Sequence, residues 1–155
     1  MRTEISFSPA FAMATVHLDN GETASAEAGA MMAMSPEIEI TTSTRGGVLK
    51  GLRRSVLGGE SFFVNTFRAT GNGAHVVVAP ALPGDVMTWP MSGGTVYLQS
   101  GSYLASSDGI DIDSKWGGAK TFFSKEGLFM LRCTGSGELV VSSYGAIHAV
   151  DLTAG

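Results

Sequence analysis

The chain is poor in the residues from which small domains build covalent or metal cross-links. Its 155 residues include a single cysteine, Cys133, so an intramolecular disulfide cannot form and no cysteine pair can hold zinc. Stability therefore has to come from burial, and a reducing compartment is expected. Apolar runs fall short of the roughly 20 residues of a spanning helix, and the stretch at 11–16 is too short for a signal-peptide core. These features predict a cytoplasmic protein.

Charged residues are also scarce. Asp, Glu, Lys and Arg make up only 15% of the chain, whereas apolar residues make up 44%, which is the opposite of a disordered composition. The formal net charge of −4 lacks the basic excess that usually accompanies nucleic-acid binding, so no nucleic-acid partner is expected. The length predicts a single domain over 1–155.

Glycine is abundant and is spread along the whole chain, with 21 glycines and five prolines. This distribution favours short strands joined by tight turns and excludes a helical bundle. Alternating apolar and polar residues predict half-buried strands, and denser apolar runs predict strands buried on both faces. The alternating segments are 24–27, 37–41, 96–99 and 110–113, and the dense ones are 62–67, 75–79, 128–133 and 139–142. The predicted fold is all-β, with two packed antiparallel sheets and a loop at 48–57.

The second half of the chain repeats the first. Adding 72 to seven positions of the first half reaches an identical residue each time, and further on an offset of 64 aligns 68–73 with 132–137. The seven pairs are Gly21 and Gly93, Thr23 and Thr95, Gly29 and Gly101, Ala33 and Ala105, Ser35 and Ser107, Ile38 and Ile110, and Ile40 and Ile112. The sequence therefore predicts repeat units at about 16–88 and 89–151.

Two of the matched glycines, Gly29 and Gly101, are predicted to be structural. A glycine at the same point of each unit indicates either a backbone with positive φ or a close strand crossing that a Cβ would obstruct. Residues 152–155 resemble the opening of a third unit. We therefore expect the chain to be truncated at its C-terminus, with a strand edge that is unpaired or covered by another subunit.

Several ordered motifs resemble one known family. They are the residues at 26–32 (Ala-Glu-Ala-Gly-Ala-Met-Met), 58–63, 79–85, 101–106 and 116–118, and they resemble the mitochondrial biogenesis family named for altered inheritance of mitochondria. The resemblance implies a fold similar to the tryptophan RNA-binding attenuator protein, a β-sandwich or double-stranded β-helix. It implies little about activity: bacterial members are uncharacterised, and fungal members are associated with organising the inner mitochondrial membrane. Peripheral membrane association is compatible with that resemblance.

The side chains that could carry chemistry are scattered. His17, His75 and His148 are far apart in the sequence, whereas a cupin-like metal site needs two histidines two residues apart with a carboxylate soon after. The glycine-rich segments 71–73 and 135–137 are typical of hairpin turns, since neither opens a helix as a phosphate-binding loop does. We therefore predict no catalytic, cofactor-binding or metal-binding residues.

The best local signal for a partner is a basic and aromatic segment, composed of Arg45, Lys50, Arg53, Arg54, Phe62 and Phe63. The four cations lie in a glycine-flanked loop that could be solvated, dock on an acidic neighbour, or contact nucleic acid or anionic lipid. Adjacent phenylalanines on a strand point to opposite faces, so one of them can face a partner. The methionines at 31, 32 and 34 either fill the core or form an adaptable contact surface.

Three functions follow from these patterns. The leading hypothesis is a non-enzymatic, homo-oligomeric scaffold or binding module with a possible protein partner and no cofactor. The second is a cupin-like enzyme with an unrecognised site. The third is an RNA-binding ring like the attenuator protein, which the acidic balance disfavours.

Overall fold

The computed structural model describes residues 1–43, 64–113 and 130–153, and within them the chain is all-β, as predicted. Eleven strands and one short 3-10 turn form two antiparallel sheets in this part of the chain. The elements are β1 (Arg2–Ser6), β2 (Met13–His17), β3 (Thr23–Glu27), β4 (Met31–Met34), β5 (Ile38–Ser43), β6 (Val64–Ala69), β7 (His75–Val78), β8 (Gly84–Gln99), η1 (Ser100–Ser102), β9 (Tyr103–Ser107), β10 (Ile110–Asp113) and β11 (Met130–Tyr144).

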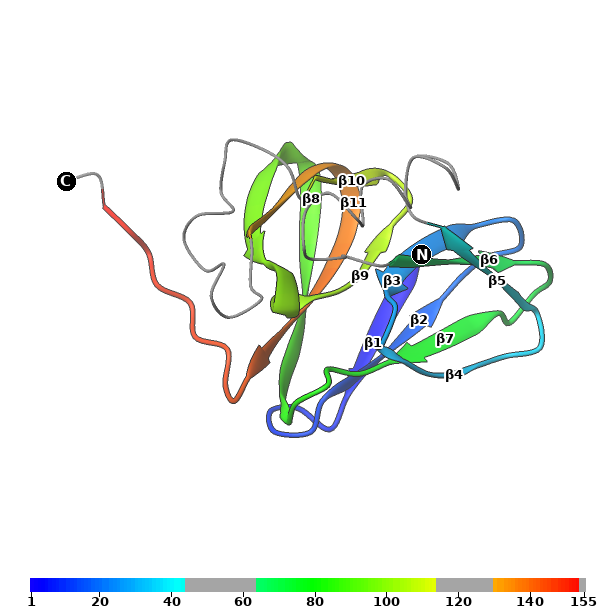
Figure 1. Ribbon diagram of the computed structural model, residues 1–155, viewed down its shortest axis with the longest axis horizontal. Coiled ribbons are helices and arrows are strands. Elements are labelled where there is room, and N and C mark those ends of the chain that lie inside the picture. The colour runs from blue at the N-terminus through cyan, green and yellow to red at the C-terminus, as the bar shows by residue number, and fades with distance from the viewer. Residues whose placement is uncertain (44–63, 114–129, 154–155) are drawn as a thin grey trace, which may run out of the picture.

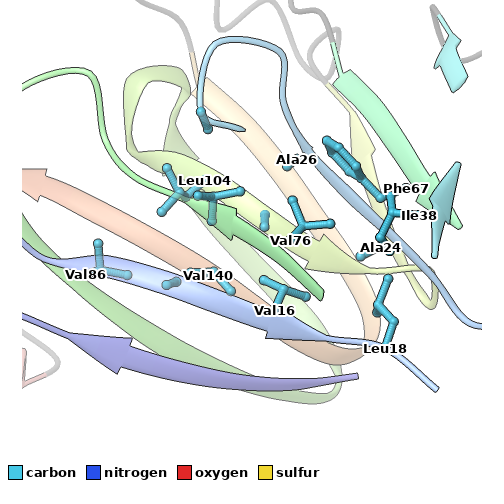
Figure 2. Packing of buried hydrophobic residues seen from close by; sticks show 14 of the residues in the cluster. Val16, Leu18, Ala24, Ala26, Ile38, Phe67, Val76, Val86, Leu104 and Val140 are labelled. Carbon is cyan, nitrogen blue, oxygen red and sulfur yellow. The ribbon is translucent and has the colours of Figure 1, made fainter. Parts of the chain in front are cut away.

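One sheet has the strand order β1-β2-β7-β4, and the other has the order β10-β11-β9-β3-β6-β5, with β8 also paired to β11 (Figure 1). The main core lies between them. Val16 and Val76 from the first sheet meet Ala24 and Phe67 from the second (Figure 2). Many of the buried positions hold alanine, which lets the two layers approach closely.

The strand pairing of the first half recurs in the second half. β2 pairs with β7 so that Val16 lies opposite Val76, and the first part of β8 pairs with the last part of β11 so that Thr88 lies opposite Val140. The offsets of 72 and 64 found in the sequence connect these two pairs. In addition, Gly21 and Gly93 share a left-handed backbone, with φ of 87° and 93°. The duplication and its unit boundaries at about 16–88 and 89–151 stay a prediction.

Strands β3 and β9 join the two halves and lie at the centre of the larger sheet. Ser25 is paired with Ser106, and both residues are buried. Along β9, Leu104 packs into the main core while Tyr103 packs into a second apolar cluster around Leu131 and Leu139. The two cores therefore lie on opposite faces of this central strand.

The prediction of which strands are buried on both faces was wrong in part. β7 was expected to be buried on both faces, but only Val76 and Val78 are buried, because the outer face of its sheet meets solvent. β3 was expected to be half-buried, yet Ala24, Ser25 and Ala26 are all buried. The position of β3 between two cores decides its burial, and its own sequence pattern does not reveal that position.

Gly29 and Gly101 do not have the positive φ that was one of the two reasons predicted for a glycine at these positions. Neither is among the glycines with positive φ in the described chain. A Cβ on Gly29 would meet only the flexible carboxylate of Glu27, at 3.2 Å, and Gly101 lies in the 3-10 turn η1. The backbone constraint belongs instead to Gly21 and Gly93.

Candidate functional site

The segment predicted from sequence as an interaction surface lies outside the described residues. Arg45, Lys50, Arg53, Arg54, Phe62 and Phe63 all fall within 44–63. The structure therefore does not test whether these side chains form one surface, and their role stays a prediction.

An apolar hollow of about 620 Å³ opens at the end of the molecule where β1 turns into β2 and β8 begins. Its volume lies within the range of binding sites for small ligands and side chains. We call it the apolar hollow. Its lining comes from three separate parts of the chain: Phe7, Phe11, Ala12, Met13, Met32, Ala79, Pro80, Ala81, Leu82, Pro83 and Gly84.

Four large apolar side chains of the lining are more than half exposed. The exposed fractions are 70% for Phe7, 73% for Phe11, 63% for Met32 and 59% for Leu82. Single exposed apolar residues are ordinary on protein surfaces, but several around one concavity are typical of an interaction site.

The backbone at Phe7 is in the left-handed region, with φ of 61°. A bulky residue rarely adopts this conformation, which costs on the order of 1–3 kcal/mol. Phe7 follows directly on the last residue of β1, so this turn directs its ring outward at the start of the 7–12 loop. Strain of this kind is commonly retained where a side chain has a function, and the exposed ring of Phe7 recovers little burial energy in return.

Hydrogen bonds attach the 7–12 loop to the beginning of β8. The Ala12 N–H donates to the Gly84 carbonyl at 3.0 Å, and the Ser8 hydroxyl donates to Asp85 Oδ1 at 2.6 Å. The same carboxylate oxygen accepts the Val86 N–H at 2.9 Å. The aromatic wall of the hollow is thereby held against the start of β8, whose first residue, Gly84, also lines the hollow.

Met32 reaches the hollow because of an irregularity in strand pairing. Met31 is opposite Val78 and Ala33 is opposite Val77, so Met32 is the extra residue of a β-bulge. A bulge turns its extra side chain away from the regular alternation of the strand. Of the two uses expected for the methionines, Met32 and Met34 take the exposed one, whereas Met31 packs against the core.

The linker at 79–83 forms another wall of the hollow. A hydrogen bond anchors its first residue, because the Ala79 N–H donates to the Ala30 carbonyl at 2.9 Å. At the end of this linker, Gly84 packs directly against the Ser143 carbonyl of β11, in space that a Cβ would need. Leu82 projects from between these two fixed points. The wall is therefore preorganised, which lowers the entropic cost of binding.

The lining contains only Phe, Ala, Met, Leu, Pro and Gly residues, so it carries no ionisable or hydrogen-bonding side chain. Such a surface can attract apolar groups by removing them from water. It has no side chain that could select a charge, orient a polar substrate or transfer a proton. The arrangement is suited to docking an apolar group.

The structure brings together two of the histidines that the sequence separates. His17 and His75 are opposite each other on β2 and β7, with ring centroids 6.0 Å apart. His75 Nδ1 lies 3.0 Å from the Gly73 carbonyl oxygen, and His17 Nε2 lies 3.7 Å from Glu4 Oε2. No group of three metal-ligating side chains forms within the described residues.

The only cysteine is buried and remote from the hollow. Cys133 lies on β11 in the second apolar cluster. Burial, with a smaller contribution from the negative charge of Asp111, raises the pKa of its thiol to about 11. A thiol that stays protonated at neutral pH is a poor nucleophile, so Cys133 is a packing residue.

Comparisons with known proteins give a family and a fold. The model of the family described as Mitochondrial biogenesis AIM24 matches residues 3–155. An uncharacterised protein of Streptococcus pyogenes serotype M6 is 27% identical over 163 residues, which cover 100% of this chain and 65% of that protein. A crystal structure of a Streptococcus pyogenes protein superposes with a TM-score of 0.75 at 22% identity and covers 93% of this chain and 65% of that one. This chain thus spans about 65% of the length of both.

Proposed function

The chain belongs to the mitochondrial biogenesis AIM24 family, and from that premise and the geometry of the hollow we propose a non-enzymatic binding module. In this proposal the module is part of an oligomeric scaffold, and the apolar hollow docks an apolar segment of a protein chain. A cytoplasmic location is part of the same proposal. No helix among the described residues is long and apolar enough to cross a membrane.

The observation that carries this proposal is the exposure of Phe7, Phe11, Met32 and Leu82 around one concavity. Full burial of a side chain of this kind contributes about 1.5–3 kcal/mol. Most of that free energy is not realised while the four side chains face water. A ligand that covers them would gain it on a surface that is already held in place by the Ala12 and Asp85 hydrogen bonds.

A protein segment suits this surface better than a small polar substrate does. Sites for small molecules combine apolar walls with a few polar groups that fix the orientation of the ligand. The lining of the hollow has no polar side chain. A protein segment needs only apolar anchors here, because other parts of the same chain can supply orientation.

The cupin-like alternative needs converging metal ligands. Within the described residues no three His, Cys, Asp or Glu side chains gather in that way, and the facing histidines His17 and His75 have only Glu4 near them. No specific observation in the described part of the chain favours this second function.

Binding of an uncharged fluorescent probe, N-phenyl-1-naphthylamine, tests the proposed function. The probe should saturate the wild-type protein and brighten as it leaves water. Leu82→Asp places a charge in the wall of the hollow, and we expect it to weaken binding by at least about tenfold, which corresponds to the loss of one buried leucine contact.

Ile40→Asp is the matched control, because Ile40 is an exposed branched residue on β5 that does not line the hollow. It should leave probe binding unchanged, and thermal melts should show that both variants are folded. Equal binding by the wild type and by Leu82→Asp would contradict the proposed function, and so would the absence of binding by the wild type.

A further inference from the structure

Beyond β11 the chain continues as an extended segment, residues 146–153, that carries exposed apolar side chains. We call it the tail. Val150 is 67% exposed and Leu152 is 91% exposed, and the tail contains no helix or strand. In Figure 1 it leads away from both sheets. An extended apolar segment of this kind gains free energy when a concave apolar surface covers it.

The tail begins at the rim of the apolar hollow. The Gly145 N–H donates to the Pro83 carbonyl at 3.2 Å, and the Gly145 carbonyl accepts the Asp85 N–H at 2.9 Å. Pro83 and its neighbour Gly84 both line the hollow. Gly145 has φ of 77°, a conformation open to glycine, and it sets the direction in which the tail leaves its own sheet.

We infer that the apolar hollow receives the tail of a second copy of this chain. The inference rests on the proposed function, because it requires the hollow to dock an apolar protein segment. Both complementary features lie at the same end of the molecule: the hollow is concave, and the root of the tail is at its rim. A twofold axis beside this end brings each tail to the other copy's hollow, which gives a closed dimer with two equal contacts.

The side chains of the tail fit this arrangement. In an extended chain, residues two apart point to the same side, so Val150 and Leu152 share one face and Ala149, Asp151 and Thr153 share the other. Within 149–153 one face of the tail therefore presents two neighbouring aliphatic groups and the opposite face carries Asp151 and Thr153. Nearer the root of the tail, the same alternation places His148 on the aliphatic face and Ile147 on the opposite face. The uncharged hollow can take the aliphatic face while Asp151 remains in water.

Self-association of three variants of the 155-residue chain tests the inference. Val150→Asp with Leu152→Asp removes the apolar face of the tail. Ala149→Asp with Thr153→Asp adds the same two charges to the opposite face and is the matched control. Leu82→Asp alters the hollow and leaves the tail intact. All these side chains are exposed in the structure, so each variant should fold, and circular dichroism melts check this.

Light scattering after size-exclusion chromatography, over a broad range of concentrations, should show a dimer for the wild type and for the control pair. The tail variant and the hollow variant should dissociate at least about a hundredfold more readily, the value that corresponds to two lost aliphatic contacts. Mixing these two variants should give a heterodimer that is weaker than the wild-type dimer, because one contact joins an intact tail to an intact hollow while the other contact joins the two altered partners. No rearrangement confined to a single chain produces this complementation.

Two results would overturn the inference: a wild type that is monomeric at every concentration, or a tail variant that dimerises as the wild type does. A monomer that still binds N-phenyl-1-naphthylamine would leave the proposed function standing and assign the hollow to another protein. If probe binding were also absent, both proposals would fail.

Discussion

Replacing Phe7 with glycine should leave the fold nearly as stable as the wild type while weakening the binding of apolar ligands in the hollow. The left-handed backbone of Phe7, with φ of 61°, costs on the order of 1–3 kcal/mol, which glycine would not pay. Two effects oppose this gain. Glycine makes the unfolded chain more flexible, which costs about 0.5–1 kcal/mol on folding, and the variant loses the free energy contributed by the buried part of the Phe7 ring. Because the ring is 70% exposed, that last loss is below about 1 kcal/mol.

Phe11→Gly is the matched comparison, because the Phe11 ring is 73% exposed and its backbone is outside the left-handed region. Both variants lose a similar ring and gain similar flexibility, so their free energies of unfolding should differ by about 1–3 kcal/mol in favour of Phe7→Gly. Urea denaturation measures this difference, and probe titration should show that both variants bind more weakly. If Phe7→Gly were the less stable of the two, Phe7 would be a packing residue, and the reasoning from strain to function would be refuted.

Three further predictions concern the framework around the hollow and the two cores. Gly84→Ala should lower the free energy of unfolding by about 1–3 kcal/mol, because its Cβ would overlap the Ser143 carbonyl. Gly29→Ala is the control, and in thermal melts of both variants it should change the free energy of unfolding by well under 1 kcal/mol. Tyr103→Phe should cost about 1–3 kcal/mol in denaturant titrations, since the buried Tyr103 hydroxyl contacts the Ser25 carbonyl at 3.1 Å and the Ser106 hydroxyl at 3.0 Å. For Cys133 the folded pKa of about 11 is above the ordinary value of 9.0, so between these pH values the unfolded state has lost the thiol proton that the folded state keeps. The free energy of unfolding should therefore fall by up to about 2–3 kcal/mol as the pH rises through this window. Cys133→Ala has no thiol, so its free energy of unfolding, measured by denaturation, should start lower and should not show this part of the pH dependence.

Strands with a clear alternating pattern, including β3 with its small residues, could be predicted from the sequence, whereas β2 could not. The alternation at Ile110–Asp113 marks β10 correctly. In contrast, β2 was not predicted, because its core depends on alanine: Ala12 and Ala14 are as buried as Val16. Alanine contributes little to a hydrophobicity pattern, yet it is what closely spaced layers require.

The apolar hollow could not be predicted from the sequence, because its parts come together only through the fold. Phe7 and Leu82 are far apart along the chain, and they become neighbours because the Ala12 N–H donates to the Gly84 carbonyl. Met32 joins them through a bulge that depends on pairing with β7. The string at 79–85 carries a family resemblance, but its residues do not indicate that the linker forms a wall of the hollow.

The most direct test of the central claim, that the apolar hollow is a docking site, is a methyl NMR spectrum of protein labelled at the methionine methyl groups. Met13 and Met32 line the hollow, whereas Met91 is buried in the second apolar cluster. Titration with N-phenyl-1-naphthylamine should shift the Met13 and Met32 signals in a saturable way and leave the Met91 signal in place. Shifts at Met91 without shifts at Met13 and Met32, or no saturable shift at any of the three, would contradict the claim.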